Sequence, residues 1–237
     1  MIPLPTATLA LLGFLAAHQG DTTDLRLHAA GAVTVTSNGI SLIPALTLGK
    51  PAGILDVAIG RRGWSFAPQF RWALEGRPWA FIFWGRYRFP TGDKFHFVVG
   101  AHPAFSFKTV SGEIVARRYF ATEVAPSYTL TRHLDLGAYY FYSKGIDDES
   151  IQNTHMIAAR GWLTNIPIAR DFAVHFAPQL YYLAMDGDDG TYFTSTLSLS
   201  HRKLPISLAS LITEPIQSDI AGGQEFLWNV SVVYSIR

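Results

Sequence analysis

The sequence contains no cysteine, which excludes disulfide bonds, thiolate zinc sites and cysteine nucleophiles. Charged residues are also scarce, at 16% against roughly 25% in an ordinary soluble protein, whereas hydrophobic residues make up 49% and aromatic residues 14%. This balance indicates that something other than water faces part of the surface. The formal net charge of +1 lacks the basic excess of a nucleic-acid-binding protein, so we expect no nucleic-acid partner.

Long apolar runs are absent as well. After the N-terminal region, Arg, His, Gln, Ser or Pro interrupts every apolar run before it reaches the length of a membrane-spanning helix, about 18 residues. A bundle of membrane-spanning helices is therefore excluded.

The N-terminal region contains an apolar segment, Ala7–Ala17, with the length of a signal-peptide core. Ala16 and Ala17 supply small residues for a cleavage site ahead of a polar stretch, but no Lys or Arg precedes Arg26, so the usual positive charge is missing. We expect a signal peptide over residues 1–19 and one barrel domain over residues 20–237. The alternatives are a mis-assigned start and an apolar segment that is retained.

The rest of the chain alternates between two chemical types with period two, which is the pattern of strands with unlike faces. One face of Pro78–Phe89 is strongly aromatic, with Trp79, Phe81, Phe83, Tyr87 and Phe89. The opposite face carries Ala80, Ile82, Trp84, Arg86 and Arg88. The last segment, Phe226–Ile236, resembles the terminal strand that the barrel-assembly machinery reads, so we expect this machinery as a partner during biogenesis. The chain departs from that pattern by ending in Arg237.

Twelve segments show this alternation, and the pattern also allows ten or fourteen. They are residues 25–36, 53–61, 64–74, 78–89, 95–107, 114–129, 134–144, 153–164, 171–184, 190–201, 205–215 and 224–236. Connections after even-numbered segments are short, and most connections after odd-numbered segments are longer. An even strand number with this loop pattern predicts an all-β fold, a transmembrane antiparallel up-and-down barrel with both termini on the periplasmic side.

Alternation alone fits a soluble barrel equally well, so composition has to decide between the two. A soluble barrel covers its outer face with Lys, Glu, Asp and Thr, yet this chain has only five lysines. Tyr and Trp residues near the strand ends resemble the interfacial girdles of membrane barrels. The girdle candidates are Trp64, Trp72, Trp79, Tyr87, Tyr128, Tyr140, Tyr142 and Trp228. We therefore predict a barrel in the bacterial outer membrane, with its lipid as a partner.

Residues 36–89, followed by VVGAHPAFSFKT at 98–109, resemble the N-terminal half of uncharacterised porin-like outer-membrane proteins of Gram-negative bacteria. The resemblance is general over the remainder of the chain. It implies a barrel, but it brings neither a substrate nor catalytic residues.

The face opposite the aromatic one carries more positive than negative groups. The candidates for lining a pore are Arg71, Arg86, Arg88, His96, His102, Arg117, Glu123, Asp135, Arg160 and His175. If water fills the lumen, this lining favours anions and predicts a narrow diffusion channel for small solutes. The same residues also fit a structural or surface protein whose lumen is filled by ion pairs, because buried charges must be paired. The sequence identifies neither the solute nor the oligomeric state.

Enzymatic and metal sites find weaker support. Ser200-His201 and His155 are the nearest candidates for an outer-membrane lipid hydrolase, but neither has a recognisable motif, so no catalytic residue is assigned. Residues 186–190, with the sequence DGDDG, contain the carboxylates and glycines that calcium needs, but they also match an ordinary hairpin turn. We expect the turn, and we assign no metal or cofactor.

Overall fold

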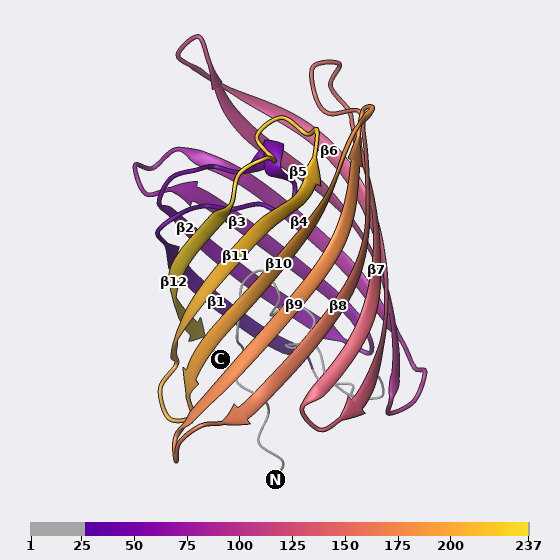
Figure 1. Cartoon of the computed structure of the whole chain (residues 1–237), viewed down its shortest axis with the longest axis vertical. Coiled ribbons are helices and arrows are strands. Elements are labelled where there is room, and N and C mark those ends of the chain that lie inside the picture. Colours follow the sequence, from indigo (N-terminus) through magenta and orange to yellow (C-terminus); the bar gives the residue numbers. More distant parts are fainter. Residues whose placement is uncertain (1–26, 237) are drawn as a thin grey trace.

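The computed structural model describes residues 27–236, which form one closed barrel of antiparallel strands (Figure 1). The expected signal peptide lies outside the described residues. Within them no helix is long and apolar enough to cross a bilayer. The elements are β1 (His28–Thr36), η1 (Pro44–Leu46), β2 (Ala52–Arg61), β3 (Trp64–Ala73), β4 (Pro78–Phe89), β5 (Phe95–Val110), β6 (Glu113–Thr131), β7 (Leu134–Gly145), β8 (Asn153–Pro167), β9 (Phe172–Met185), β10 (Asp188–His201), β11 (Ile206–Ser218) and β12 (Leu227–Ile236).

Each strand pairs with its neighbours in the sequence, and β1 pairs with β12 to close the ring. The closing pair runs antiparallel from Gly31 opposite Ile236 to Thr36 opposite Ser231. The prediction of a twelve-stranded up-and-down barrel is therefore confirmed. The longer connections, 37–51, 146–152 and 219–226, lie at the end away from the start of β1, which we call the outer end.

The strand limits agree with the predicted segments to within three residues. Strands β5 and β6 continue to a two-residue turn, Ser111–Gly112, in which both residues have positive φ. Such a turn matches the twist of the two strands and lets the hairpin extend. This hairpin projects beyond its neighbours at the top of Figure 1. Asp186–Gly187 makes a turn of the same kind between β9 and β10.

Large apolar side chains cover the outside of the barrel, as the alternation predicted. Leu197 and Val230 are half exposed, and the rings of Phe70, Phe81 and Phe107 pack side by side over β3–β5, with centroid distances of 5.3 and 4.9 Å. Monomeric soluble proteins rarely expose apolar surface on this scale, whereas membrane barrels require it. The barrel therefore presents a lipid-facing belt.

Candidate functional site: the barrel lumen

All ten predicted pore-lining residues lie on the inward-facing positions of their strands. Arg71, His102, Glu123 and His175 are between 4 and 8% exposed, and the others are partly buried. Asp56, which the same alternation predicts to face inward, shares this face, as does Tyr139, which the prediction did not include. Two groups of interacting side chains result, one on β2–β4 and one on β4–β8.

The first group centres on Asp56 of β2. The side-chain amide of Gln69 donates a hydrogen bond to the Asp56 carboxylate, and Arg71 Nε donates to Gln69 Oε1 at 2.6 Å. The Arg71 guanidinium lies 5.0 Å from the centre of the Trp79 ring. The glutamine therefore bridges a buried carboxylate and a buried guanidinium, which satisfies part of the hydrogen-bonding capacity of each.

The second group centres on Glu123 of β6. Arg86 Nε donates to Glu123 Oε1 at 2.5 Å, and the Tyr139 hydroxyl donates to Glu123 Oε2 at 2.8 Å. Two guanidiniums lie over aromatic rings, Arg86 at 3.9 Å from the centre of Trp84 and Arg160 at 3.5 Å from the centre of Tyr139. Cation–π contacts of this kind hold an arginine side chain in one position against the inner surface of the barrel.

The two sides of the lumen differ in chemistry. The side formed by β2–β8, the charged wall, carries inward-facing arginines at positions 71, 86, 88 and 160 and three inward-facing carboxylates, Asp56, Glu123 and Asp135. A further inward-facing arginine, Arg117, binds Glu149 near the outer end. The opposite side, the hydroxyl wall, is lined by uncharged side chains on β10–β12 and β1, most of them small. They include Thr34, Thr36, Thr194, Thr196, Ser198, Ser200, Ser207, Thr213, Ser231 and Ser235. A solute in the lumen therefore meets the positive groups from one side.

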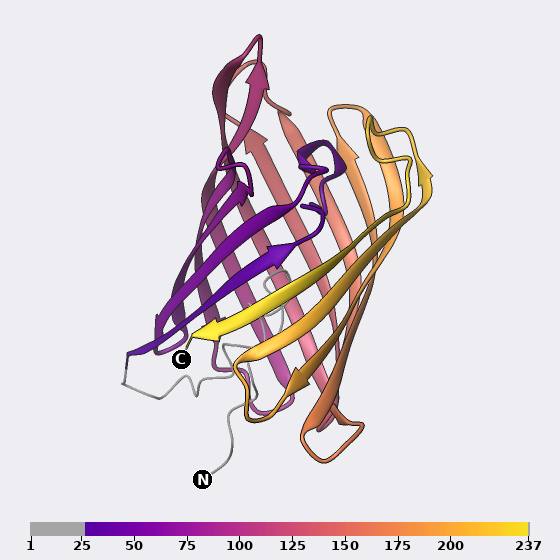
Figure 2. The ribbon, with the colours of Figure 1, turned by 90° about the vertical axis from the view of Figure 1, so that its left-hand side faces the viewer.

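The connection between β1 and β2, residues 37–51, folds into the outer opening, and we call it the inner loop (Figure 2). Its carbonyl groups accept hydrogen bonds from Asn229 Nδ2 at 2.9 Å, from the Tyr181 hydroxyl at 3.0 Å and from Trp79 Nε1 at 2.8 Å. The last two donors belong to β9 and β4, which four strands separate on one side of the ring and six on the other. The inner loop thus crosses the bore and narrows it.

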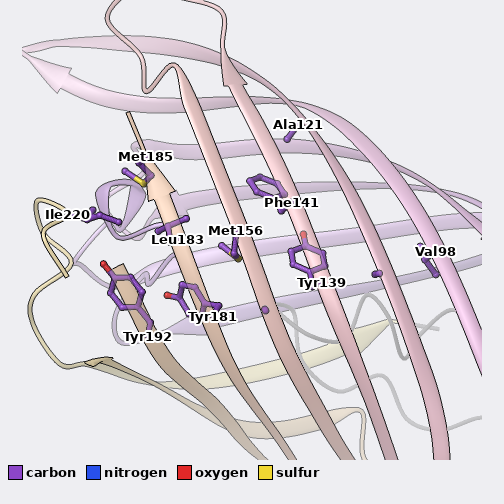
Figure 3. Close-up of a cluster of buried hydrophobic side chains, with 12 residues drawn as sticks. Val98, Ala121, Tyr139, Phe141, Met156, Tyr181, Leu183, Met185, Tyr192 and Ile220 are labelled. Atoms are coloured by element: carbon purple, nitrogen blue, oxygen red, sulfur yellow. The ribbon is translucent and has the colours of Figure 1, made fainter. Parts of the chain in front are cut away.

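Apolar contacts with the barrel wall also hold the inner loop in place. Ile40 is only 1% exposed, and Leu42, Ile43 and Ala45 pack against the largest buried cluster. Figure 3 shows the part of this cluster that lies at the outer end, with Tyr181 and Leu183 from β9, Tyr192 from β10, and Ile220. The narrowing is therefore packed like a protein core on the β9–β10 side.

The predicted position of Trp79 is wrong. It was expected in the outward-facing girdle, but it is 4% exposed and lies inside, against the inner loop. The reason is a register shift in the pairing of β3 with β4 between Arg71 and Trp72, which turns the first residues of β4. From Ala80 onward the predicted faces are correct.

The other girdle candidates lie on the outside of the barrel. Trp64, Tyr128, Tyr140 and Trp228 are exposed. Trp72, Tyr87 and Tyr142 are half-buried and contact the outward rings of Phe70, Trp64 and His155.

The structure does not bring the predicted serine and histidine candidates together. Ser200 faces inward, and its Oγ lies 2.9 Å from Nε2 of His175, a pairing across strands that the sequence did not reveal. His201 packs instead on Phe172, and His155 lies on the outer surface, 3.0 Å from the Tyr140 hydroxyl. His175 Nδ1 accepts the backbone N–H of Asn165, so Nε2 carries the proton and donates to Ser200. A histidine in this tautomer cannot serve as the base for that serine.

In the acidic turn at residues 186–190, the carboxylate of Asp186 has a structural role. Asp186 accepts the backbone N–H groups of Gln152 and Asn153, both at 2.7 Å, and so ties the turn to the start of β8. Two-residue turns with positive φ are ordinary hairpin connections.

No protein-family model and no curated protein matches the chain. Among solved structures, a NanC porin matches with a TM-score of 0.53 and 15% identity over 88% of this chain and 98% of that one. LpxR from Salmonella typhimurium matches with a TM-score of 0.52 and 8% identity over 86% and 99%. The fold is that of porin-like outer-membrane β-barrels. This fold and the lipid-facing belt together place the chain in the bacterial outer membrane. Identities this low show a shared fold and no shared activity.

Proposed function

We propose that the protein is a narrow diffusion channel of the outer membrane that prefers small anions. The observation that carries this proposal is the charged wall, where Arg71, Arg86, Arg88 and Arg160 face the lumen against three carboxylates. Lining charge sets the electrostatic barrier to permeation, so an excess of guanidinium groups lowers the barrier for an anion. Guanidinium groups are also matched in geometry to carboxylates and phosphates.

The second candidate is a structural or surface protein with a filled lumen. The observation in its favour is the engagement of the charged groups: Glu123 binds both Arg86 and Tyr139, and Asp56 binds Gln69. The inner loop adds to the filling of the outer half. This candidate predicts no ion flow through the purified barrel.

Conductance in planar bilayers tests both candidates. Reversal potentials in a KCl gradient measure the ratio of chloride to potassium permeability. We expect discrete channels with a ratio above one, and a lower ratio for Arg71→Gln and Arg160→Gln. The matched control is Arg118→Gln, because Arg118 binds Asp147 at the exposed outer edge. The absence of discrete channels would favour the filled barrel, and cation preference in the wild type would refute anion selection.

A further inference from the structure

The connections at the two ends of the barrel carry opposite charge. At the outer end, the connections 37–51, 74–77, 111–112, 146–152, 186–187 and 219–226 contain seven Asp or Glu residues and two Lys or Arg residues. The other end, at the bottom of Figure 1, is called the periplasmic end here, because short connections of such barrels face the periplasm. Its connections, 62–63, 90–94, 132–133, 168–171 and 202–205, contain two Asp residues and six Lys or Arg residues. These six cations form the basic rim: Arg62, Lys94, Arg132, Arg170, Arg202 and Lys203.

The chain neutralises little of the basic rim. All six residues of the rim are exposed. Among residues 27–236, Lys203 is the only member of the rim that pairs with a carboxylate, that of Asp171 at 3.5 Å. The two cations of the outer connections differ, because Lys50 and Arg77 both lie beside Glu75, at 3.4 and 3.7 Å. The guanidinium and ammonium groups of the basic rim are therefore available to anionic groups from outside the chain.

An exposed apolar side chain accompanies the cations at each of the five periplasmic connections. It lies within two residues of a rim cation in every case, and its exposed fraction is between 43% and 65%. These side chains are Trp64, Phe95, Leu130, Ile168 and Leu204. Aromatic rings and long cationic side chains are typical of the depth at which acyl chains meet headgroups. The lipid-facing belt therefore extends to the basic rim, and the cations border the membrane.

We propose that the basic rim binds the headgroups of anionic phospholipids in the leaflet that faces the periplasm. Phosphate oxygens accept hydrogen bonds from guanidinium and ammonium groups, and the apolar side chains beside the rim contact the acyl chains of the same molecule. One cation near an anionic lipid surface strengthens association about fivefold. An acidic periplasmic protein would match the charge of the rim but not its apolar neighbours. This inference does not rest on the proposed function, because it requires no ion flow through the lumen.

Electron spin resonance of spin-labelled phospholipids tests the proposal on the folded barrel in phosphatidylcholine vesicles. The measured quantity is the association constant of labelled phosphatidylglycerol divided by that of labelled phosphatidylcholine. We expect a ratio above one at low ionic strength, and a fall towards one as NaCl screens the cations. Soluble glycerol 3-phosphate at the same concentration as the labelled lipid should leave the ratio unchanged, because it has no acyl chains to contact the apolar side chains.

Two double variants locate the binding. Arg132→Gln with Arg170→Gln should lower the ratio about twofold, because it removes two of the six cations of the basic rim. The matched control is Lys50→Gln with Arg77→Gln, which removes the same charge from the outer end, where the vesicle offers the same lipids. Circular dichroism verifies that both variants are folded.

Three results would overturn the proposal. A wild-type ratio of one would mean that the rim does not select anionic lipid, as expected if its partner is an acidic protein. Displacement of labelled phosphatidylglycerol by glycerol 3-phosphate would mean that the rim binds free phosphate groups. An equal fall of the ratio in both double variants would mean that net charge alone, and not the basic rim, attracts the lipid.

Discussion

Gly100 lies directly opposite Glu123 in the pairing of β5 with β6, and the missing side chain gives the carboxylate its place. A Cβ atom at position 100 would lie 2.7 Å from Glu123 Oε1 and 3.1 Å from Arg86 Cγ. Strand β5 separates β4 from β6, so Arg86 and Glu123 must meet over its surface. A glycine in the middle strand allows this buried ion pair to form.

Gly100→Ala should therefore displace the Arg86–Glu123 pair. Overpacking of a filled interior typically costs about 1–3 kcal/mol, and we expect a loss in that range. Urea-dependent unfolding of the barrel in lipid vesicles measures it. Gly85→Ala is the control, because Gly85 faces outward and its nearest neighbour would be the Ala101 carbonyl oxygen at 3.7 Å. Equal effects of the two substitutions would contradict the role given to Gly100.

Glu123→Leu alone should destabilise the barrel more than the double variant that replaces both Arg86 and Glu123. The single change leaves Arg86 buried beside an apolar side chain, and loss of one partner of a buried pair costs about 3–5 kcal/mol. The double variant Arg86→Met, Glu123→Leu replaces the pair by apolar groups and should recover most of that loss. The same unfolding measurement compares the two. A double variant less stable than the single one would show that the pair itself stabilises the barrel.

The sequence predicted the strands well because the two faces of each strand meet different surroundings. Both ends of Pro78–Phe89 are predicted correctly, since one face is aromatic apart from Gly85 and the opposite face ends in Arg86 and Arg88. The inward placement of Arg86 and Glu123 follows from the same alternation. A period of two within one strand is local information, and one sequence is enough to read it.

Features that depend on pairing between strands could not be predicted in this way. The inward position of Trp79 follows from a register shift against β3, and the contact of His175 with Ser200 follows from the register of β9 and β10. Alternation within a strand does not define its register with the next strand. The sequence of the inner loop does carry one sign of its inward position, because Ile40 and Leu42 are apolar residues in a connection between strands.

Trp79→Phe should loosen the inner loop without unfolding the barrel. Phenylalanine keeps a ring in the interior but cannot donate to the Leu46 carbonyl, and one such hydrogen bond contributes about 1 kcal/mol. Hydrogen–deuterium exchange should become several times faster for the loop amides of Leu46 and Leu48, which are bonded within the loop. Trp228→Phe, at an exposed outward position, should leave these rates unchanged. Unchanged exchange in Trp79→Phe would show that the bond does not hold the loop.

The contact of Asp147 with Arg118 predicts how the outer edge responds to acid. The Arg118 side chain and backbone N–H both donate to the Asp147 carboxylate, and these bonds lower the pKa of Asp147 below its ordinary value of 3.8. A carboxyl whose pKa is lower in the folded state stabilises that state above its unfolded pKa, and the effect disappears as the pH falls through the folded pKa. Protection of the Arg118 amide against hydrogen exchange, corrected for the intrinsic rate, should therefore stay constant from pH 7 to 5 and fall only below about pH 4. Asp147→Asn should lower this protection at neutral pH, and Asp148→Asn, a change at the neighbouring exposed residue, should not. Loss of wild-type protection between pH 6 and 5 would rule out Asp147 as the group responsible.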